Sequence, residues 1–329
     1  MATTKQQVLA LFEQNRGRNL SGETIAKQVG VSRNAVWKVI QELTHGGYDI
    51  TRVAGRGYTF ERRNDRLSPE GIAPYLHRPE QAQQIRIYPE LPSTNTTAKG
   101  LAVAGDTSHG SIVITDDQTA GRGRYGRAWF AAPGKSVCLS FVLHPSKLAM
   151  ATPSLMTIFA AVATAQAIEA CFGIQARIKW VNDLFLGDKK ICGILTEAVT
   201  DFESGQMDWV VLGIGINFCM EVEDFPEPLQ SIGTALFDGN NPPRGTRNQL
   251  IGELINQVMT LEQGFDQAQV IASYKSRLMM LGERITVHTP REQYEATALD
   301  IDVEGRLIIE TSDGIQQTLS FGEISVRSQ

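Results

Sequence analysis

Residues 176–217 read ARIKWVNDLFLGDKKICGILTEAVTDFESGQMDWVVLGIGIN, and this stretch decides the fold. Runs rich in Val, Ile and Leu alternate with short polar segments, a pattern typical of successive strands. Strands that follow one another directly predict an α+β domain with a mixed sheet rather than a doubly wound α/β fold. The expected strands are 176–180, 184–186, 191–198 and 209–217.

The region before this stretch supplies further strands and two helices of the same central domain. Residues 85–88, 112–115 and 136–143 are expected strands. Ser93 is a hydroxyl cap that begins a helix reaching about Ala104. Residues 156–172 form a long, Ala-rich apolar helix that belongs in the core.

Residues 121–127 read GRGRYGR and follow the expected strand 112–115. Three glycines let the backbone approach a ligand closely, and three arginines keep their charge, so the loop is suited to phosphates. The spacing also matches the Gly-x-Gly-x-x-Gly signature of dinucleotide-binding folds, which requires a following helix and an acidic residue about 20 positions on. Residues 128–134 are poor helix formers, and 141–150 contain no Asp or Glu. The other alternative is a solvated basic turn.

Polar residues stand at the ends of three expected strands. Asn182 and Asp183 follow one strand, Lys190 precedes an apolar run, and Asn217 ends a third strand. A lysine that enters an apolar strand tends to be partly buried and to pair with a fixed anion. Taken alone, Asp183 reads as a turn residue and Asn217 as a strand-end cap. Together with the arginine loop, these residues predict nucleotide binding.

The N-terminal segment is basic, whereas the rest of the chain is acidic. Residues 1–66 carry eleven Lys and Arg against six Asp and Glu, and the other 263 residues carry twenty against thirty. Helical patterns capped by Ser21 and Ser32, with Gly30 between them, predict a helix-turn-helix, and two strands around Gly55–Gly57 form a wing. We expect this winged helix to bind DNA, and a protein-interaction module is the alternative. The residues expected to face DNA are Ser32, Arg33, Asn34, Lys38 and Arg56.

The C-terminal segment reads as five short strands, which suggests a small SH3-like barrel. The barrel either helps to close the site, receives a partner protein, or serves packing alone. Two helices, 248–265 and 268–278, are expected to join it to the central sheet. The strands are expected at 284–288, 294–299, 306–310, 317–320 and 324–327. The domains are expected at 1–64, 67–275 and 280–329, with the charged run 61–66 as linker.

Composition favours a cytoplasmic protein. No run of about 18 residues reads as a membrane span, and the N-terminus lacks the apolar core of a signal peptide. The four cysteines lie far apart with no Cys-x-x-Cys and no His at ligand spacing, so neither a zinc site nor a disulfide framework is expected.

These motifs together resemble the bifunctional biotin-protein ligases that also repress the biotin operon. The GRGRYGR loop is similar to that family's biotin and adenylate loop, and residues 179–183 look like its Lys-Trp-Pro-Asn-Asp motif. The likeness covers the whole chain, including the winged helix. Tyr125 stands where some members have Arg, and Val181 replaces the motif's Pro. The other matching positions are Ser93-Thr-Asn95, Gln118, Lys190 with Gly193, Gly213-x-Gly215-x-Asn217 and Gly322–Ser325.

The resemblance implies a two-step reaction with ATP, biotin and Mg²⁺. Biotin and ATP would give biotinyl-5′-adenylate, and a lysine of the biotin carboxyl carrier protein would then take the biotin. By this resemblance Lys190 and Arg124 are catalytic, and Asp183 places Mg²⁺. Its biotin-binding residues correspond to Ser93, Thr94, Asn95, Gln118, Gly121, Arg122, Lys190, Gly193, Gly213 and Gly215. Its ATP- and adenylate-binding residues correspond to Arg124, Arg127, Trp129, Lys179, Asn182 and Asn217.

The resemblance also implies a repressor that binds operator DNA of biotin genes as a homodimer carrying the adenylate. A winged helix of this size contacts few bases, so two half-sites are expected. Two alternatives stay open: a biotin-sensing repressor without ligase activity, and an enzyme related to lipoate ligases.

Overall fold

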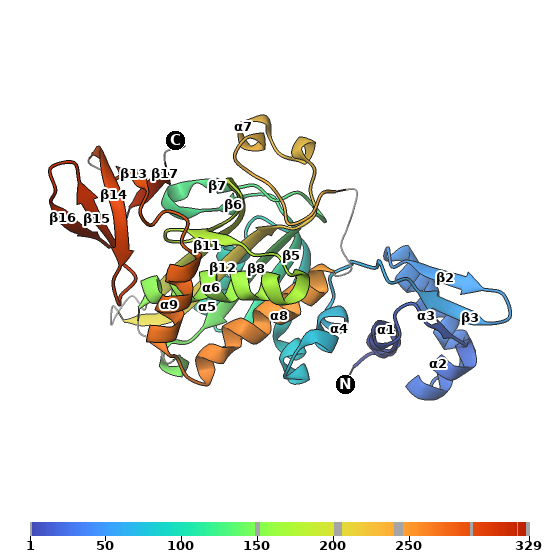
Figure 1. Cartoon of the computed structure of the whole chain (residues 1–329). Coiled ribbons are helices and arrows are strands. Elements are labelled where there is room, and N and C mark those ends of the chain that lie inside the picture. The colour runs from blue at the N-terminus through green and yellow to red at the C-terminus, as the bar shows by residue number, and fades with distance from the viewer. Residues whose placement is uncertain are drawn as a thin grey trace. The chain divides into compact units, whose positions relative to one another are not determined.

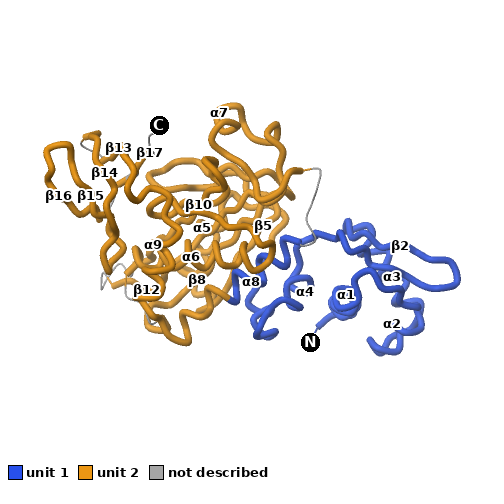
Figure 2. Tube along the Cα trace, viewed as in Figure 1, with its two compact units in different colours: residues 1–87, 244–256 blue, residues 88–243, 257–329 orange. Residues whose placement is uncertain are grey.

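A computed structural model describes residues 2–148, 152–200, 206–239, 246–289, 292–320 and 322–326. The chain divides into two compact units, which Figure 2 shows in different colours. One unit comprises residues 1–87 with 244–256, and the other comprises 88–243 with 257–329.

The N-terminal unit begins with a helix-turn-helix, as predicted (Figure 1). Its helices are α1 (Thr4–Gln14), α2 (Gly22–Val29) and α3 (Arg33–His45). Hydroxyl side chains of Thr3, Ser21 and Ser32 cap the three helices by accepting from backbone N–H groups. Gly30 ends α2 at φ +75°, a left-handed conformation that glycine adopts without a steric penalty.

A three-stranded sheet completes the winged helix. Its order is β1 (Asn19–Leu20), β3 (Gly57–Phe60), β2 (Ile50–Val53), and the β2–β3 turn is the predicted wing. Phe60 is fully buried and stacks on Phe12 of α1, with ring centroids 5.5 Å apart. This contact fixes the wing against the helices.

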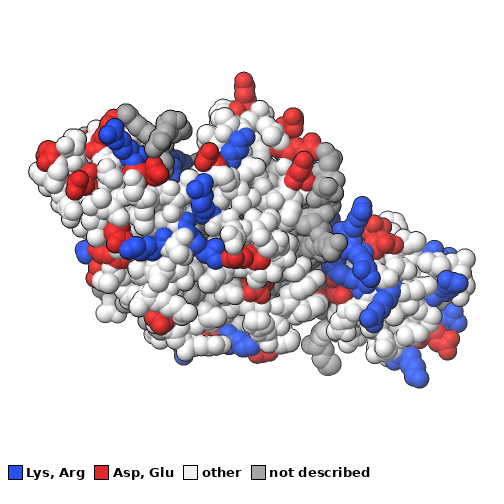
Figure 3. Space-filling view, viewed as in Figure 1, with Lys and Arg blue, Asp and Glu red and all other residues white. Residues whose placement is uncertain are grey.

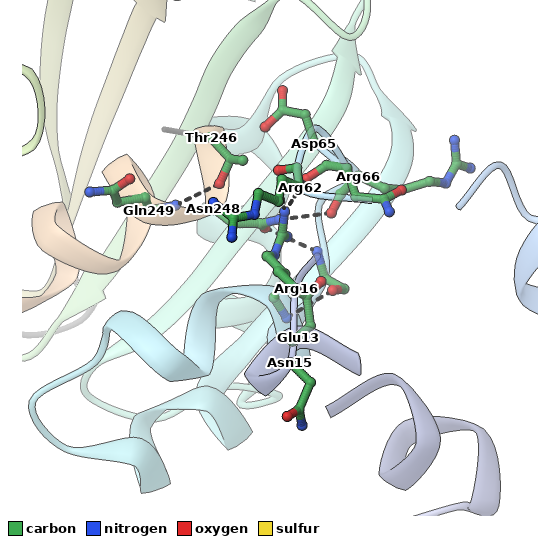
Figure 4. A network of polar contacts seen from close by, with 12 residues as sticks. Glu13, Asn15, Arg16, Arg62, Asp65, Arg66, Thr246, Asn248 and Gln249 are labelled. Carbon is green, nitrogen blue, oxygen red and sulfur yellow. Dashed lines mark hydrogen bonds and ion pairs between the residues drawn. The ribbon is translucent and has the colours of Figure 1, made fainter. Parts of the chain in front are cut away.

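The charged linker after β3 forms hydrogen bonds with two other parts of the same unit. The Asn64 side chain accepts from the backbone N–H of Asp49, and the Asn64 carbonyl accepts from Arg16 at 2.6 Å. Asp65 accepts from the backbone and Nε of Arg247, each at 2.7 Å, at the start of α8 (Arg247–Met259). Figure 4 shows this network, in which Asn248 also reaches the linker backbone at Arg66. The linker therefore has a defined conformation.

The remaining elements of this unit are short. They are α4 (Pro69–Ile72) and two 3-10 turns, Ala73–Tyr75 and Pro79–Gln84. The predicted helix 248–265 ends at Met259, and a 3-10 turn, Thr260–Glu262, follows.

The second unit is built on the predicted central sheet. The seven strands are ordered β4-β5-β8-β12-β11-β10-β9, and from β5 to β9 each pairs antiparallel with its neighbour. The strands are β4 (Ile85–Leu91), β5 (Ser111–Gln118), β8 (Ser136–Leu143), β9 (Arg177–Lys179), β10 (Asp183–Leu186), β11 (Lys189–Thr200) and β12 (Met207–Asn217).

Two helices cover opposite faces of this sheet. Glu197 of β11 bonds to α5 (Thr94–Ala104), whereas its neighbour Thr196 bonds to Thr157 of α6 (Pro153–Phe172). Successive residues of a strand point to opposite faces, so α5 and α6 lie on the two sides of the sheet. All eight residues of β8, in the middle of the sheet, are therefore buried.

Helix α6 corrects one expectation. Among the described residues it is long and apolar enough to cross a membrane, which we had not expected of any segment. It is instead the core helix predicted at 156–172, because 72% of its apolar window is buried inside the protein. A buried helix needs no bilayer to cover it.

The C-terminal segment forms the predicted SH3-like β domain. Its antiparallel order is β16-β15-β14-β13-β17. The strands are β13 (Arg284–His288), β14 (Gln293–Ile301), β15 (Leu307–Thr311), β16 (Gln316–Leu319) and β17 (Glu323–Val326), and α9 (Gln267–Arg277) precedes them. Arg327, predicted to end the last strand, lies outside the described residues. The other short elements are α7 (Glu227–Gln230) and 3-10 turns at Pro145–Lys147 and Val222–Asp224.

Candidate functional site

Small residues hollow out the sheet face that α5 covers. Gly193 on β11 pairs with Gly215 on β12, and Cys138 and Ser140 on β8 pair with Gly215 and Gly213. Alternate residues of a strand share a face, so these five form one patch that carries only two small side chains. All of the patch except Ser140 lines the floor of a cavity, whose walls come from the start of α5, the arginine loop and β10.

The start of α5 turns buried polar side chains toward this cavity. Ser93, Thr94 and Asn95 are at most 4% exposed, and all three line it. The backbone N–H of Thr94 donates to Gln118 Oε1 at 2.9 Å. Ser93 Oγ caps α5 by accepting from the N–H of Thr96. These uncharged groups have fixed positions, which suits recognition of an uncharged polar group of a ligand.

Trp129 lies against two glycines of the cavity floor. A Cβ atom on Gly215 would be 2.5 Å from the indole Nε1, and one on Gly193 would be 3.0 Å from Cζ3. Lys190 Nζ lies 5.6 Å from the indole centroid. Nε1 is buried and has no hydrogen-bond partner. Glycine at position 215 is needed to leave room for this indole, and a side chain at position 193 would crowd it.

A cation and a carboxylate meet at the edge of the cavity. Lys190 Nζ lies 2.7 Å from Asp183 Oδ2, and Asp183 Oδ1 is buried without a partner. The nearby Cys192 thiol is fully buried, and desolvation, reinforced by the Asp183 carboxylate, raises its pKa far above the ordinary value. Cys192 is therefore a neutral thiol and not a nucleophile.

The arginine loop is a hairpin of β6 (Gly121–Arg122) and β7 (Ala128–Trp129). A 3-10 turn, Arg124–Gly126, joins the two strands, so no helix follows the third glycine and the dinucleotide alternative is wrong. Arg124 donates to Asn182 Oδ1 and to the Tyr125 hydroxyl, each at 3.2 Å. Tyr125 has φ +56°, and its ring lies 5.0 Å from the Arg124 guanidinium carbon. Tyr125 thus helps to hold Arg124.

Two hydrogen bonds to the C-terminal part of the chain hold the segment between β9 and β10 in place. Trp180 Nε1 donates to the Gly305 carbonyl at 3.0 Å, and the Tyr274 hydroxyl of α9 donates to the Val181 carbonyl at 2.9 Å. Tyr274 is fully buried, and desolvation raises its pKa well above the ordinary value, so it stays a neutral donor. These contacts position Asn182 and Asp183 at the cavity.

A second cavity adjoins the first beside the C-terminal strands. It is lined by Lys179 together with His288 and Ser325. Arg124, Arg127, Asn182 and Asp183 line both cavities. Two adjoining compartments with shared cations suit a ligand that has an uncharged end and an anionic end.

The predicted DNA-reading face of α3 is exposed. Ser32, Arg33, Asn34 and Lys38 are exposed, as is Arg56 at the tip of the wing. Trp37 lies on the same face and is 51% exposed. Figure 3 shows basic side chains spread over the surface of this unit. Exposed cations beside groove-reading side chains are typical of DNA-binding surfaces.

Comparison with known proteins places this architecture in a family. The chain is 34% identical over 327 residues to the bifunctional ligase/repressor BirA of Bacillus spizizenii, a match that covers 97% of this chain and 98% of the relative. The chain belongs to the BirA family of bifunctional ligase/repressors. It is 31% identical to BirA of Escherichia coli, over 94% of this chain and 93% of the relative.

The parts of the BirA family correspond to separate matches along the chain. Residues 4–59 match a helix-turn-helix domain, 88–217 match the biotin/lipoate A/B protein ligase family, and 280–327 match the biotin protein ligase C-terminal domain. The fold is also that of a biotin protein ligase from Aquifex aeolicus solved with biotin and ATP, with a TM-score of 0.62 and 23% identity. That likeness covers 74% of this chain and 99% of the other.

Most of the predicted ligand residues of this BirA family member share the first cavity. Gly121, Lys179 and Asn217 do not line it, and Lys179 lines the second cavity instead. Asn217 Nδ2 donates to the Thr234 carbonyl at 2.9 Å, while its Oδ1 is buried without a partner. The residues brought together are Ser93, Thr94, Asn95, Gln118, Arg122, Arg124, Arg127, Trp129, Asn182, Asp183, Lys190, Gly193, Gly213 and Gly215.

Sequence reasoning missed several residues that organise the site. Ser140 lies in strand β8 and Glu197 in strand β11, both mostly apolar, where an isolated serine or glutamate gave no distinct signal. Their places in the strand alternation were the available signal, because both share the face of the cavity floor. Tyr274 lies on the helix α9, where no pattern in the sequence marked it as part of the site.

Proposed function

We propose that the chain activates biotin with ATP and attaches it to a lysine of a biotin carboxyl carrier protein. In the first step a carboxylate oxygen of biotin attacks the α-phosphorus of ATP, and pyrophosphate leaves. In the second step the uncharged lysine amine attacks the acyl carbon of the mixed anhydride, AMP leaves, and the nitrogen loses a proton. The family and its printed relatives support this substrate class.

One observation carries the proposal: a single cavity combines an uncharged polar end with a cationic end. Thr94 and Gln118 provide hydrogen-bonding groups at one end, and Arg124, Arg127 and Lys190 provide charge at the other. Joining two anions is opposed by their repulsion, and negative charge builds on the phosphoryl oxygens in the transition state. Fixed cations beside a pocket for the ureido ring lower this barrier.

Each remaining ligand residue has a proposed task. Gly121 and Arg122 lie along the biotin tail, Trp129 stacks near the adenine, and Asn217 reads the adenine edge. Lys179 of the second cavity approaches the phosphates.

Asp183 is the proposed protein contact for Mg²⁺. Its partnerless Oδ1 offers a hard oxygen ligand. No group of three or more His, Cys, Asp or Glu suited to a metal exists in the described part of the chain. Phosphate oxygens and water would therefore complete the coordination, and the ion would supply charge neutralisation on the phosphates.

Pyrophosphate exchange tests the enzymatic proposal. The protein is incubated with biotin, ATP and labelled pyrophosphate, and label entering ATP requires the adenylation step. Exchange that needs lipoate instead of biotin supports the lipoate alternative. Binding of biotin without exchange supports a repressor that only senses the vitamin.

We further propose that the adenylate-bound protein dimerises and represses biotin genes in the cytoplasm. Two exposed α3 faces in a dimer would read two half-sites of an operator. The observation in favour is the exposed basic face of the winged helix in a BirA family member. Operator affinity measured with and without biotin and ATP tests the coupling, and equal affinity under both conditions contradicts it.

A further inference from the structure

A carboxylate behind the cavity receives two donors from one helix. Glu197 of β11 accepts from Lys99 Nζ on Oε1 at 2.6 Å and from Asn95 Nδ2 on Oε2 at 2.8 Å. Lys99 and Asn95 lie one turn apart on α5, and about a quarter of the Glu197 side chain is exposed. A carboxylate has two accepting oxygens, whereas a carboxamide has only one. A carboxylate at position 197 therefore gives each donor an oxygen of its own, which a carboxamide cannot do.

Glu197 fixes which way the Asn95 amide points. Asn95 Nδ2 also donates to the Leu195 carbonyl at 3.2 Å. Neither the Leu195 carbonyl nor the Glu197 carboxylate can donate, so the amide nitrogen must face them and Oδ1 must face Ser140 Oγ, 2.6 Å away. A Cβ atom on Gly213 would collide with Asn95 Oδ1, so the sheet holds the amide closely from the other side.

The orientation of the Asn95 amide then decides to which atoms the Ser140 and Thr94 hydroxyl groups donate their hydrogens. Ser140 is fully buried and has one hydroxyl hydrogen, which must go to Asn95 Oδ1 because that oxygen only accepts. Thr94 Oγ1 lies 2.8 Å from Ser140 Oγ and 3.2 Å from Gln118 Oε1. The Thr94 hydroxyl donates its hydrogen to Gln118 Oε1. Thr94 Oγ1 consequently presents only lone pairs to the cavity.

We propose that Glu197 is a positioning residue that keeps the Ser140 hydrogen away from Thr94, so that Thr94 stays an acceptor and favours a ligand with N–H donors. The inference rests on the proposed function, because the ureido ring of biotin carries two N–H groups and the dithiolane ring of lipoate carries none. Glu197 acts through Asn95 and Ser140 and does not touch the ligand. A carboxamide at position 197 can turn its nitrogen toward Asn95, which favours a flipped Asn95 amide, and only the longer bond to the Leu195 carbonyl then opposes the flip. In the flipped state Ser140 donates its hydrogen to Thr94 Oγ1 and occupies one of the lone pairs of that oxygen.

The test uses the full chain and a paired rescue. In Glu197→Gln, Lys99 and Asn95 compete for one acceptor, so we expect the KM for biotin in pyrophosphate exchange to rise about tenfold or more. The KM for ATP and the kcat at saturating biotin should stay within about twofold, since the cationic end is unchanged. Adding Lys99→Met removes the competing donor, so Glu197→Gln/Lys99→Met should recover the biotin KM to within about threefold of wild type.

Matched variants separate this role from a general loss of stability. Lys99→Met alone keeps the carboxylate for Asn95 and should leave the biotin KM near the wild-type value. Asp300→Asn removes a more exposed ion pair, that with Lys275, away from both cavities and should also leave the biotin KM unchanged. A biotin KM of Glu197→Gln within about twofold of wild type, or a defect that Lys99→Met fails to rescue, overturns the inference and leaves the proposed function standing. A wild-type protein without biotin-dependent exchange overturns both.

Discussion

Lys190 Nζ and Asp183 Oδ2 form an ion pair of 2.7 Å at the mouth of the cavity, across the antiparallel pair β10–β11. The side chains are 32% and 23% exposed, so water screens the pair and its net stabilisation is small. By the proposed function, Lys190 would exchange the carboxylate for a phosphate when ATP binds. The same exchange would leave Asp183 as an uncompensated carboxylate beside the triphosphate, which is the situation that attracts a divalent cation.

Removal of either cation at this end should slow adenylate formation. We expect Lys190→Ala or Arg124→Ala to lower the rate of biotin-dependent pyrophosphate exchange by about 10² or more, because each removes charge that stabilises the transition state. Lys189→Ala is the control, since the neighbouring lysine bonds to the Gln230 carbonyl and lines neither cavity. Rates of Lys190→Ala and Arg124→Ala close to wild type would remove both residues from the catalytic assignment.

Gly215→Ala should disturb the floor of the cavity. The added Cβ would be 2.5 Å from Trp129 Nε1, so the indole must move into the space expected for the ligand. We expect biotin affinity, measured by titration calorimetry, to fall at least about tenfold. Gly100→Ala is the control, because an added Cβ there meets nothing within 4 Å. Unchanged affinity in Gly215→Ala would show that the indole is not packed on this glycine in solution.

Trp37 should contribute to DNA binding without contributing charge. It lies on α3 between Asn34 and Lys38 and is 51% exposed. We expect Trp37→Ala to weaken operator binding about tenfold with an unchanged salt dependence. By contrast, Lys38→Ala should reduce the slope of log affinity against log salt by about one, because it removes a phosphate contact. Fluorescence anisotropy across a salt series distinguishes the two, and a changed slope in Trp37→Ala would contradict this assignment.

The stability of the winged helix should depend on a buried acid. The Glu13 side chain is almost fully buried and has one partnerless oxygen, and desolvation raises its pKa above 4.5, while Arg16 opposes the shift. Because the folded pKa is raised, the stabilisation is present below about 4.5 and is lost as pH rises through the folded pKa. We therefore expect the melting temperature of wild type relative to Glu13→Gln to fall as the pH rises above 4.5. Calorimetry of both proteins checks this, and parallel curves would contradict it.

Much of the architecture could be predicted because its signals are local. Ser21, Gly30 and Ser32 mark helix ends within a few residues, and the structure has a cap or stop at each. The alternation of apolar residues in 176–217 predicted strands that all formed. The end of the helix predicted at 248–265 was wrong, because its last turns tighten into a 3-10 turn.

The sequence by itself determined the winged helix, the run of strands and the arginine loop, since each depends on neighbours in the chain. Only the tertiary structure decided that Glu197 bonds to Asn95, 102 residues away, and that Lys190 faces Asp183 rather than solvent. The reason is register: the pairing of β10, β11 and β12 selects which side chains share a face of the sheet. Hydrogen-bond partners across that face follow from the pairing and not from local sequence.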